Sequence, residues 1–209
     1  MNDFNQALKN AKSLYPNTKI KYKDESVFMK FLSILLFFNK DFNTKYITTI
    51  GNSIYFPSKE YVSKNDSSCV DILCHELVHI QQSQDDKYFK LKYLFPQILA
   101  LGAFLAFIHP IFFIFLLFAL PIHAKFRAEY EYNAYVVTMY CKFNRNNNLD
   151  VKALIDGIVN NFTKSSYYWM DRDYAKLYSG FYLEMAMIKA NKNDLFNMKE
   201  KIDFVLGEN

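Results

Sequence analysis

The chain contains few of the residues that stabilise or punctuate small secreted proteins. Its 209 residues include only three cysteines, five glycines and five prolines. An odd number of cysteines without a C-x-x-C pair argues against a disulfide framework and predicts buried thiols in a reducing compartment. The first residues also lack the basic start and apolar stretch of a secretory signal, so we expect the chain to stay where it is made.

The chain also lacks a large excess of positive or negative residues. The formal net charge is +4, and both signs are interspersed along the sequence without a basic stripe. A nucleic-acid-binding surface needs such a stripe, so we expect no nucleic-acid partner. The length suffices for a substantial core, and we predict a single domain over residues 1–209.

Histidine is scarce, and two of the four fall in one short motif. His75, Glu76 and His79 spell H-E-x-x-H. Residues four apart lie on one side of a helix, so both imidazoles can reach one zinc ion, while the glutamate acts as a general base beside the open coordination position. This pattern predicts a catalytic metal site; a pair of surface histidines is the alternative.

The surrounding sequence favours a helix at this motif. Ser68 and Asp71 fit the capping-box form, which predicts a helix that begins near Cys69. Apolar residues then recur at helical spacing, which leaves the histidines on a different face from the core. These apolar residues are Val70, Leu73, Leu77 and Ile80.

The third metal ligand must come from elsewhere in the chain. A helix-compatible segment carries Glu131 three residues before Ala134, and the small alanine would let this helix approach the His75 helix closely. Glu129 is the competitor, but two residues along a helix are about 200° apart, so both acids cannot face one zinc. We predict Glu131 as the ligand; solvated surface acids are the alternative.

With these motifs the chain resembles the zincin superfamily, specifically its gluzincin branch, in which a later helix supplies a glutamate to the H-E-x-x-H site. The resemblance implies a zinc-dependent peptidase, with a strand before the metal helix lining the cleft for a peptide or protein substrate. The apolar insert between the ligands is similar to that of membrane peptidases related to the prenyl-protein endopeptidase, whose glutamate motif reads E-x-x-A-D. Here Tyr135 stands in place of that aspartate.

A second resemblance is to small peptidases carried by bacteriophages, through Gln81-Gln82 and the run Ile54-Tyr-Phe-Pro57. It would imply a phage-encoded protein. An inactive zincin scaffold in a membrane or phage particle is the main alternative to an enzyme, and a pure membrane anchor or pore former is another.

No charged residue occurs from Tyr93 to Ala124. The run exceeds the roughly 20 residues of a membrane-spanning helix, but a single crossing would leave His79 and Glu131 on opposite sides of a hydrocarbon layer about 30 Å thick. Pro110 breaks the run, so we predict that residues 93–124 form a helical hairpin. His109 and His123 are then expected as a kink residue and an interface residue.

Basic residues flank this segment and would lie beside anionic headgroups on the cytoplasmic side if the hairpin enters one leaflet. They are Lys87, Lys90, Lys92, Lys125 and Arg127. Burial of the hairpin in protein, or an oligomer interface, is the alternative.

The remaining chain predicts a mainly helical α+β fold. Residues 46–50 and 53–56 are typical of two strands around a Gly51-Asn52 turn. Amphipathic spacing predicts further helices over residues 4–14, 27–38, 151–162, 174–190 and 195–206. Tyr168 is our candidate for a hydrogen-bond donor to the oxyanion of peptide hydrolysis, with core packing as its alternative.

Overall fold

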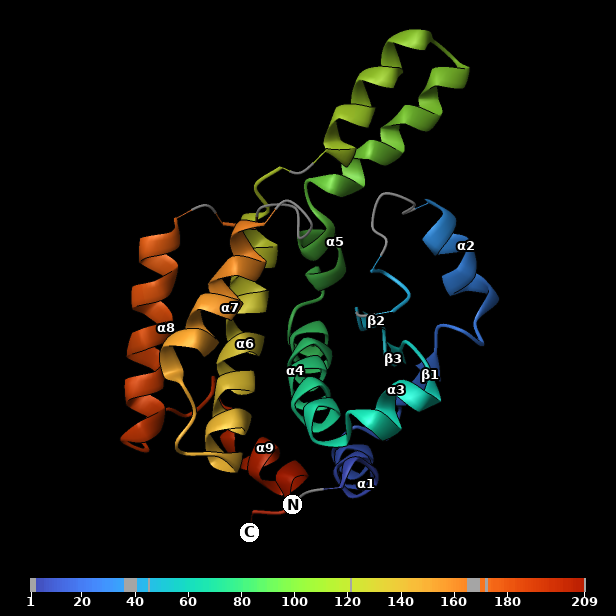
Figure 1. The fold of residues 1–209 in the computed structure, drawn as a ribbon. Helices are drawn as coiled ribbons and strands as arrows, with labels where there is room; N and C mark the ends of the chain where they lie inside the picture. The colour runs from blue at the N-terminus through green and yellow to red at the C-terminus, as the bar shows by residue number, and fades with distance from the viewer. Residues whose placement is uncertain are drawn as a thin grey trace. The chain divides into compact units, whose positions relative to one another are not determined.

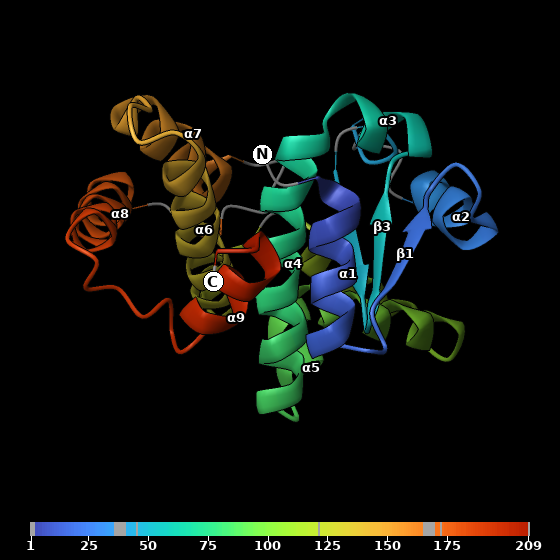
Figure 2. The same cartoon turned by 90° about the horizontal axis from the view of Figure 1, so that it is seen from below.

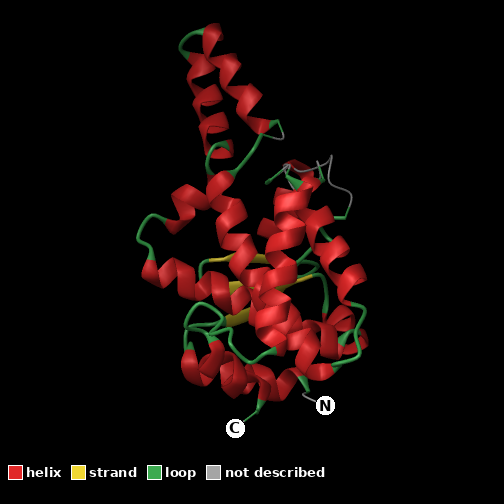
Figure 3. Ribbon diagram, turned by 90° about the vertical axis from the view of Figure 1, so that its left-hand side faces the viewer, coloured by secondary structure: helices red, strands yellow, loops and turns green. Residues whose placement is uncertain are grey.

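The computed structural model describes residues 3–35, 41–44, 46–120, 122–164, 170–171 and 173–208. Helices predominate and the strands are short (Figure 3). The mainly helical α+β expectation is therefore confirmed at this level. The α-helices are α1 (Phe4–Leu14), α2 (Val27–Leu35), α3 (Lys59–Lys64), α4 (Asp66–Asp85), α5 (Phe89–Leu94), α6 (Lys125–Arg145), α7 (Val151–Thr163), α8 (Tyr174–Lys189) and α9 (Lys199–Leu206).

The chain divides into two compact units. The first contains Met1–Gln81, Val137–Asn147 and Asp194–Asn209, and the second contains Gln82–Val136 and Asn148–Asn193. Helices α4 and α6 are each continuous, and each contributes residues to both units. The prediction of one domain over the whole chain stays a prediction.

A small mixed sheet lies in the first unit. Its strand order is β1-β3-β2, with β1 (Lys19–Tyr22) parallel and β2 (Thr48–Ile50) antiparallel to β3 (Ser53–Phe56). Gly51 has φ +59°, a left-handed conformation that glycine adopts without strain, and it joins β2 to β3. The predicted hairpin is confirmed, whereas β1 is an additional strand.

Helices pack against this sheet through buried aromatic and aliphatic residues. Helix α1 runs beside β3 (Figure 2), where the ring of Phe4 meets that of Phe56 edge to face with centroids 5.5 Å apart. On α2, Met29 joins Phe42 and Tyr55 in a buried cluster. The sheet is thus a packed support in the unit that also carries the H-E-x-x-H segment.

Local capping explains where several helices begin. Asp3, Ser58, Asp150 and Asp173 each accept a hydrogen bond from a backbone N–H in the first turn of the helix that follows. Such a side chain satisfies one of the N–H groups that a helix leaves without an internal partner, and it typically contributes about 1 kcal/mol. Helices α1, α7 and α8 accordingly begin where their sequence pattern predicts.

Two predicted boundaries are wrong. Helix α4 begins at Asp66 rather than near Cys69, because Asn65 already offers its carbonyl to the N–H of Cys69 at 2.8 Å. The last helix begins at Lys199 rather than at residue 195, because Leu195, Phe196 and Asn197 have positive φ angles and cannot continue a right-handed helix. The predicted end of α2 beyond Leu35 lies outside the described residues.

The uncharged segment of the second unit folds as two 3₁₀-helices, η1 (Gln97–Phe107) and η2 (Pro110–Ala119), which lie side by side (Figure 1). The chain turns directly before Pro110, where the sequence predicts the break. A Cβ atom built on Gly102 of η1 would lie 2.7 Å from Cγ of Phe115 on η2. Glycine therefore permits the close approach of the two arms.

His109, which the sequence predicts as a kink residue, is the N-cap of η2. Its Nδ1 accepts a hydrogen bond from the N–H of Ile111, at 3.2 Å. Within the part of the chain that the structure describes, no helix combines the length and the apolar character needed to cross a membrane.

Candidate metal centre

Helix α4 brings the three residues of the H-E-x-x-H motif together. The rings of His75 and His79 meet edge to face, with centroids 5.1 Å apart. His79 and Glu76 are 7% and 8% exposed, and His75 is half-buried. The expectation that the histidines lie away from the core is thus wrong for His79, because α4 is buried around most of its circumference.

A threonine on α6 holds one of these imidazoles. The Nδ1 atom of His75 lies 3.1 Å from Oγ1 of Thr138. In the tautomer with the proton on Nδ1, the ring donates to this hydroxyl and keeps the lone pair of Nε2 available for a metal. Metal-binding histidines are commonly oriented in this way. Sequence reasoning missed Thr138; its signal was the two-turn spacing from Glu131 on one face of α6.

The two acids considered as third ligand have different environments on α6. Glu131 is 6% exposed, and the hydroxyl of Tyr93 donates a hydrogen bond to its Oε1. The side chain of Glu129 is 60% exposed, with Lys125 at 3.9 Å as an ion-pair partner. A buried carboxylate is costly unless it is hydrogen-bonded or binds a cation, so Glu131 has the environment of a functional acid.

The side chains of His75, His79 and Glu131 converge. One ligand atom from each, an imidazole nitrogen or a carboxylate oxygen, lies within 4.8 Å of the other two. Two imidazoles and one carboxylate form a donor set of catalytic zinc sites, which leave a fourth position open. The residues present therefore fit a zinc ion, and Glu129 is not part of the cluster.

Contacts along α4 and α6 explain this convergence. The buried carboxylate of Asp71 forms an ion pair with the partly exposed Arg145, and Gln82 Nε2 donates to the carbonyl of Tyr130 at 3.1 Å. Together with the His75–Thr138 contact, these pairs run in opposite directions along the two helices, so α4 and α6 are antiparallel. Ala134, which is fully buried, stands one turn after Glu131 as predicted for a close approach.

The general-base candidate Glu76 has a buried lysine in its electrostatic surroundings. Lys23 is 1% exposed, and its Nζ donates to the carbonyl of Phe42 at 2.7 Å and lies 3.8 Å from the centroid of that ring. Burial lowers the pKa of Lys23 to about 8, although the carboxylate of Glu76 opposes this shift.

The thiols near the motif do not form part of the metal cluster. Cys69, Cys74 and Cys141 are free and buried, as the sequence predicts. Burial raises the pKa of Cys69 to about 11, so this thiol stays protonated near neutral pH. For Cys141, a hydrogen bond with Cys74 and burial raise the pKa. Tyr168 lies outside the described residues.

Comparisons with known proteins identify no relative: no protein-family model, no curated protein and no solved structure matches the chain.

Replacing Lys23 by Met should change the pH dependence of stability. The pKa of Lys23 is about 8 in the fold and about 10.5 in the unfolded chain, so the unfolded chain binds more protons between these values and the lysine's unfavourable contribution fades as pH rises. Between pH 7 and 9.5 the parent should gain roughly 2 kcal/mol in unfolding free energy relative to Lys23→Met. Urea denaturation at several pH values measures this difference.

Lys9, an exposed lysine on α1, provides the matched control. Lys9→Met should follow the parent at every pH. An unfolding free-energy difference between parent and Lys23→Met that stays constant from pH 7 to 9.5 would contradict the lowered pKa of Lys23.

Proposed function

We propose that the protein is a zinc-dependent endopeptidase of the gluzincin type that acts at a membrane surface. The observation that carries this proposal is the convergence of His75, His79 and Glu131 from two helices, with Glu76 in the same H-E-x-x-H segment. If the short motif occurred by coincidence, there would be no reason for a buried acid from a distant segment to lie beside the histidine pair. The cluster therefore adds support that is independent of the motif.

The residues have distinct roles in the proposed reaction. His75 and His79 bind zinc through imidazole nitrogens, and Glu131 completes the site with a carboxylate oxygen. A zinc ion held there would polarise the substrate carbonyl and lower the pKa of its water to about 7. Glu76 accepts the proton of the attacking water and later delivers it to the leaving amine, which is general base followed by general acid catalysis.

Burial suits this role of Glu76. A carboxylate that is 8% exposed is largely shielded from bulk water, so its interaction with a nearby proton donor is stronger than in solution.

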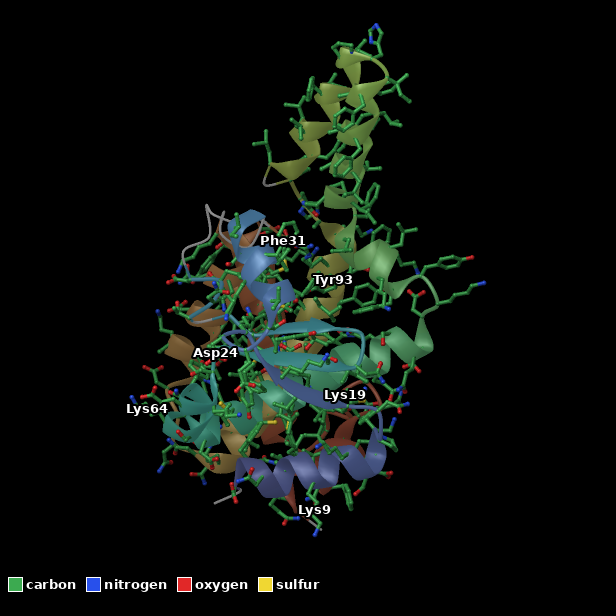
Figure 4. The ribbon with its side chains drawn as sticks, turned by 90° about the vertical axis from the view of Figure 1, so that its right-hand side faces the viewer. Lys9, Lys19, Asp24, Phe31, Lys64 and Tyr93 are labelled. Carbon is green, nitrogen blue, oxygen red and sulfur yellow. The ribbon has the colours of Figure 1, made fainter. Side chains whose placement is uncertain are left out.

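Membrane attachment is proposed through the apolar hairpin of η1 and η2. Its large side chains are exposed on both arms, with Phe104 at 69% and Ile114 at 61%, and Figure 4 shows mainly carbon sticks along it. Such a surface is unfavourable in water. At about 2.0 Å per residue, each arm reaches roughly 20 Å, which is less than the hydrocarbon thickness of about 30 Å and suits entry into one leaflet.

The charges beside the hairpin indicate which lipid it meets. Lys87 and Lys90 precede it and Lys125 follows it, and all three are exposed. Lysines that flank an inserted segment attract anionic headgroups, and each contributes about 1 kcal/mol near the membrane surface. We therefore propose an anionic leaflet as the occupant of the apolar surface, which makes a membrane-bound or membrane-proximal polypeptide the expected substrate.

Changing Glu76 to Gln should abolish hydrolysis while zinc remains bound. The amide keeps the size of the side chain but cannot accept the proton, so cleavage of fluorescently labelled, unfolded casein should fall by about 10² to 10⁴-fold. Zinc content should stay near one ion per chain. Glu129→Gln, at an exposed position of α6, is the matched control and should cleave like the parent. Equal cleavage by Glu76→Gln and the parent would contradict Glu76 as the general base, and no cleavage by either would favour an inactive scaffold over an enzyme.

Charges placed on the hairpin should prevent binding to vesicles. The parent should co-sediment with vesicles that contain phosphatidylserine and bind neutral phosphatidylcholine vesicles less, whereas Phe104→Glu with Ile114→Glu should remain in the supernatant. Leu183→Glu, at a 61% exposed position of α8, is the control for adding a charge to an exposed apolar site and should bind like the parent. Equal binding of the hairpin variant and the parent would exclude the hairpin as the lipid contact.

A further inference from the structure

Tyr93 contacts α6 at three points, all within the second unit. Its hydroxyl donates to Glu131, its backbone carbonyl accepts from Nε of Arg127 at 3.1 Å, and the Arg127 guanidinium lies 4.9 Å from its ring centroid. Arg127 and Glu131 are one turn apart and therefore lie on the same side of α6. Tyr93 thus spans one helical turn, with its backbone and ring at Arg127 and its hydroxyl at Glu131.

Aromatic neighbours restrict the ring further. Phe89, one turn earlier on α5, lies with its centroid 5.5 Å from the Tyr93 ring and 4.8 Å from the ring of Tyr130 on α6. A side chain held at its ring, hydroxyl and backbone has few alternative rotamers. Its hydroxyl group is therefore held in one position, where it donates to the Glu131 carboxylate.

The hydrogen bond from Tyr93 affects how the Glu131 carboxylate can bind a metal. A carboxylate has two oxygens and about four lone-pair sites, so accepting one hydrogen bond leaves capacity for a cation. A donor on one oxygen fixes the rotation of the group, and a fixed ligand loses less entropy when a metal binds. Residues that orient metal ligands typically change metal affinity by about 10- to 100-fold when they are altered.

We propose that Tyr93 is a positioning residue of the metal centre: its hydroxyl orients the Glu131 carboxylate for zinc. This inference rests on the proposed function, because it requires Glu131 to be a zinc ligand. Tyr93 also stands two residues before Phe95-Pro96, on the short helix that leads into the apolar hairpin (Figure 4). The same residue therefore joins the metal ligand to the segment proposed to contact lipid.

The test is the zinc affinity of Tyr93→Phe, measured by competition with a chromophoric chelator. Phenylalanine keeps the ring and its packing against Phe89 and Arg127 but removes the donated proton. Zinc should bind about 10- to 100-fold more weakly, while the thermal midpoint of the metal-free protein stays close to that of the parent. Tyr88→Phe, at a 56% exposed tyrosine in the same segment, should bind zinc like the parent.

Cobalt substitution adds a readout that a purely structural role would not change. The visible absorption of bound Co²⁺ reports ligand geometry, and its bands should shift in Tyr93→Phe but not in Tyr88→Phe. If the parent binds one zinc and Tyr93→Phe matches it in affinity and cobalt spectrum, the inference about Tyr93 is overturned while the proposed function stands. If the parent itself binds no zinc, the proposed function fails and the inference fails with it.

Discussion

The antiparallel packing of α4 against α6 is the constraint on which the candidate site depends. Partly buried polar contacts fix it, including the Asp71–Arg145 ion pair and the hydrogen bond between His75 and Thr138. Breaking one partner of such a pair leaves a buried polar group unsatisfied, so each contact opposes sliding of one helix along the other. Because Glu131 lies two turns before Thr138 on the same face of α6, this register brings it to the histidine pair.

The same register explains why a long apolar insert is compatible with one metal site. The segment between the two ligand-bearing helices leaves and returns as a hairpin, so α4 and α6 remain neighbours despite the residues between them. A single long helix in that place would separate Glu131 from His79. The folding of the uncharged segment and the geometry of the metal cluster therefore depend on each other.

Much of the local structure could be predicted from the sequence, because it is encoded locally. The bounds of α1 follow from its amphipathic spacing and Asp3 cap, and the β2–β3 hairpin follows from Gly51. Helical periodicity also predicts that only one of Glu129 and Glu131 can face the histidines, and the small Ala134 one turn after Glu131 favours the acid that the structure places there.

The missed features depend on contacts that are distant in sequence or on unusual backbone. Strand β1 (Lys19–Tyr22) has only four residues, two of them lysines, and its partner β3 lies some thirty residues further along the chain. Helix α5 has no buried residue, so its sequence lacks the apolar stripe by which an amphipathic helix is predicted. Tyr93 and Thr138 gain their meaning only from the neighbours that tertiary packing supplies, and the left-handed residues before α9 have no glycine to signal them.

The most direct test of the metal centre is zinc content after equilibration with one equivalent of zinc and gel filtration, measured by mass spectrometry for the parent, Glu131→Ala and Glu129→Ala. These two alanine variants remove neighbouring acids of the same helix, one buried in the cluster and one exposed. The account predicts one zinc per chain in the parent and in Glu129→Ala, and little or none in Glu131→Ala. Retention of the parent's zinc content by Glu131→Ala would contradict it.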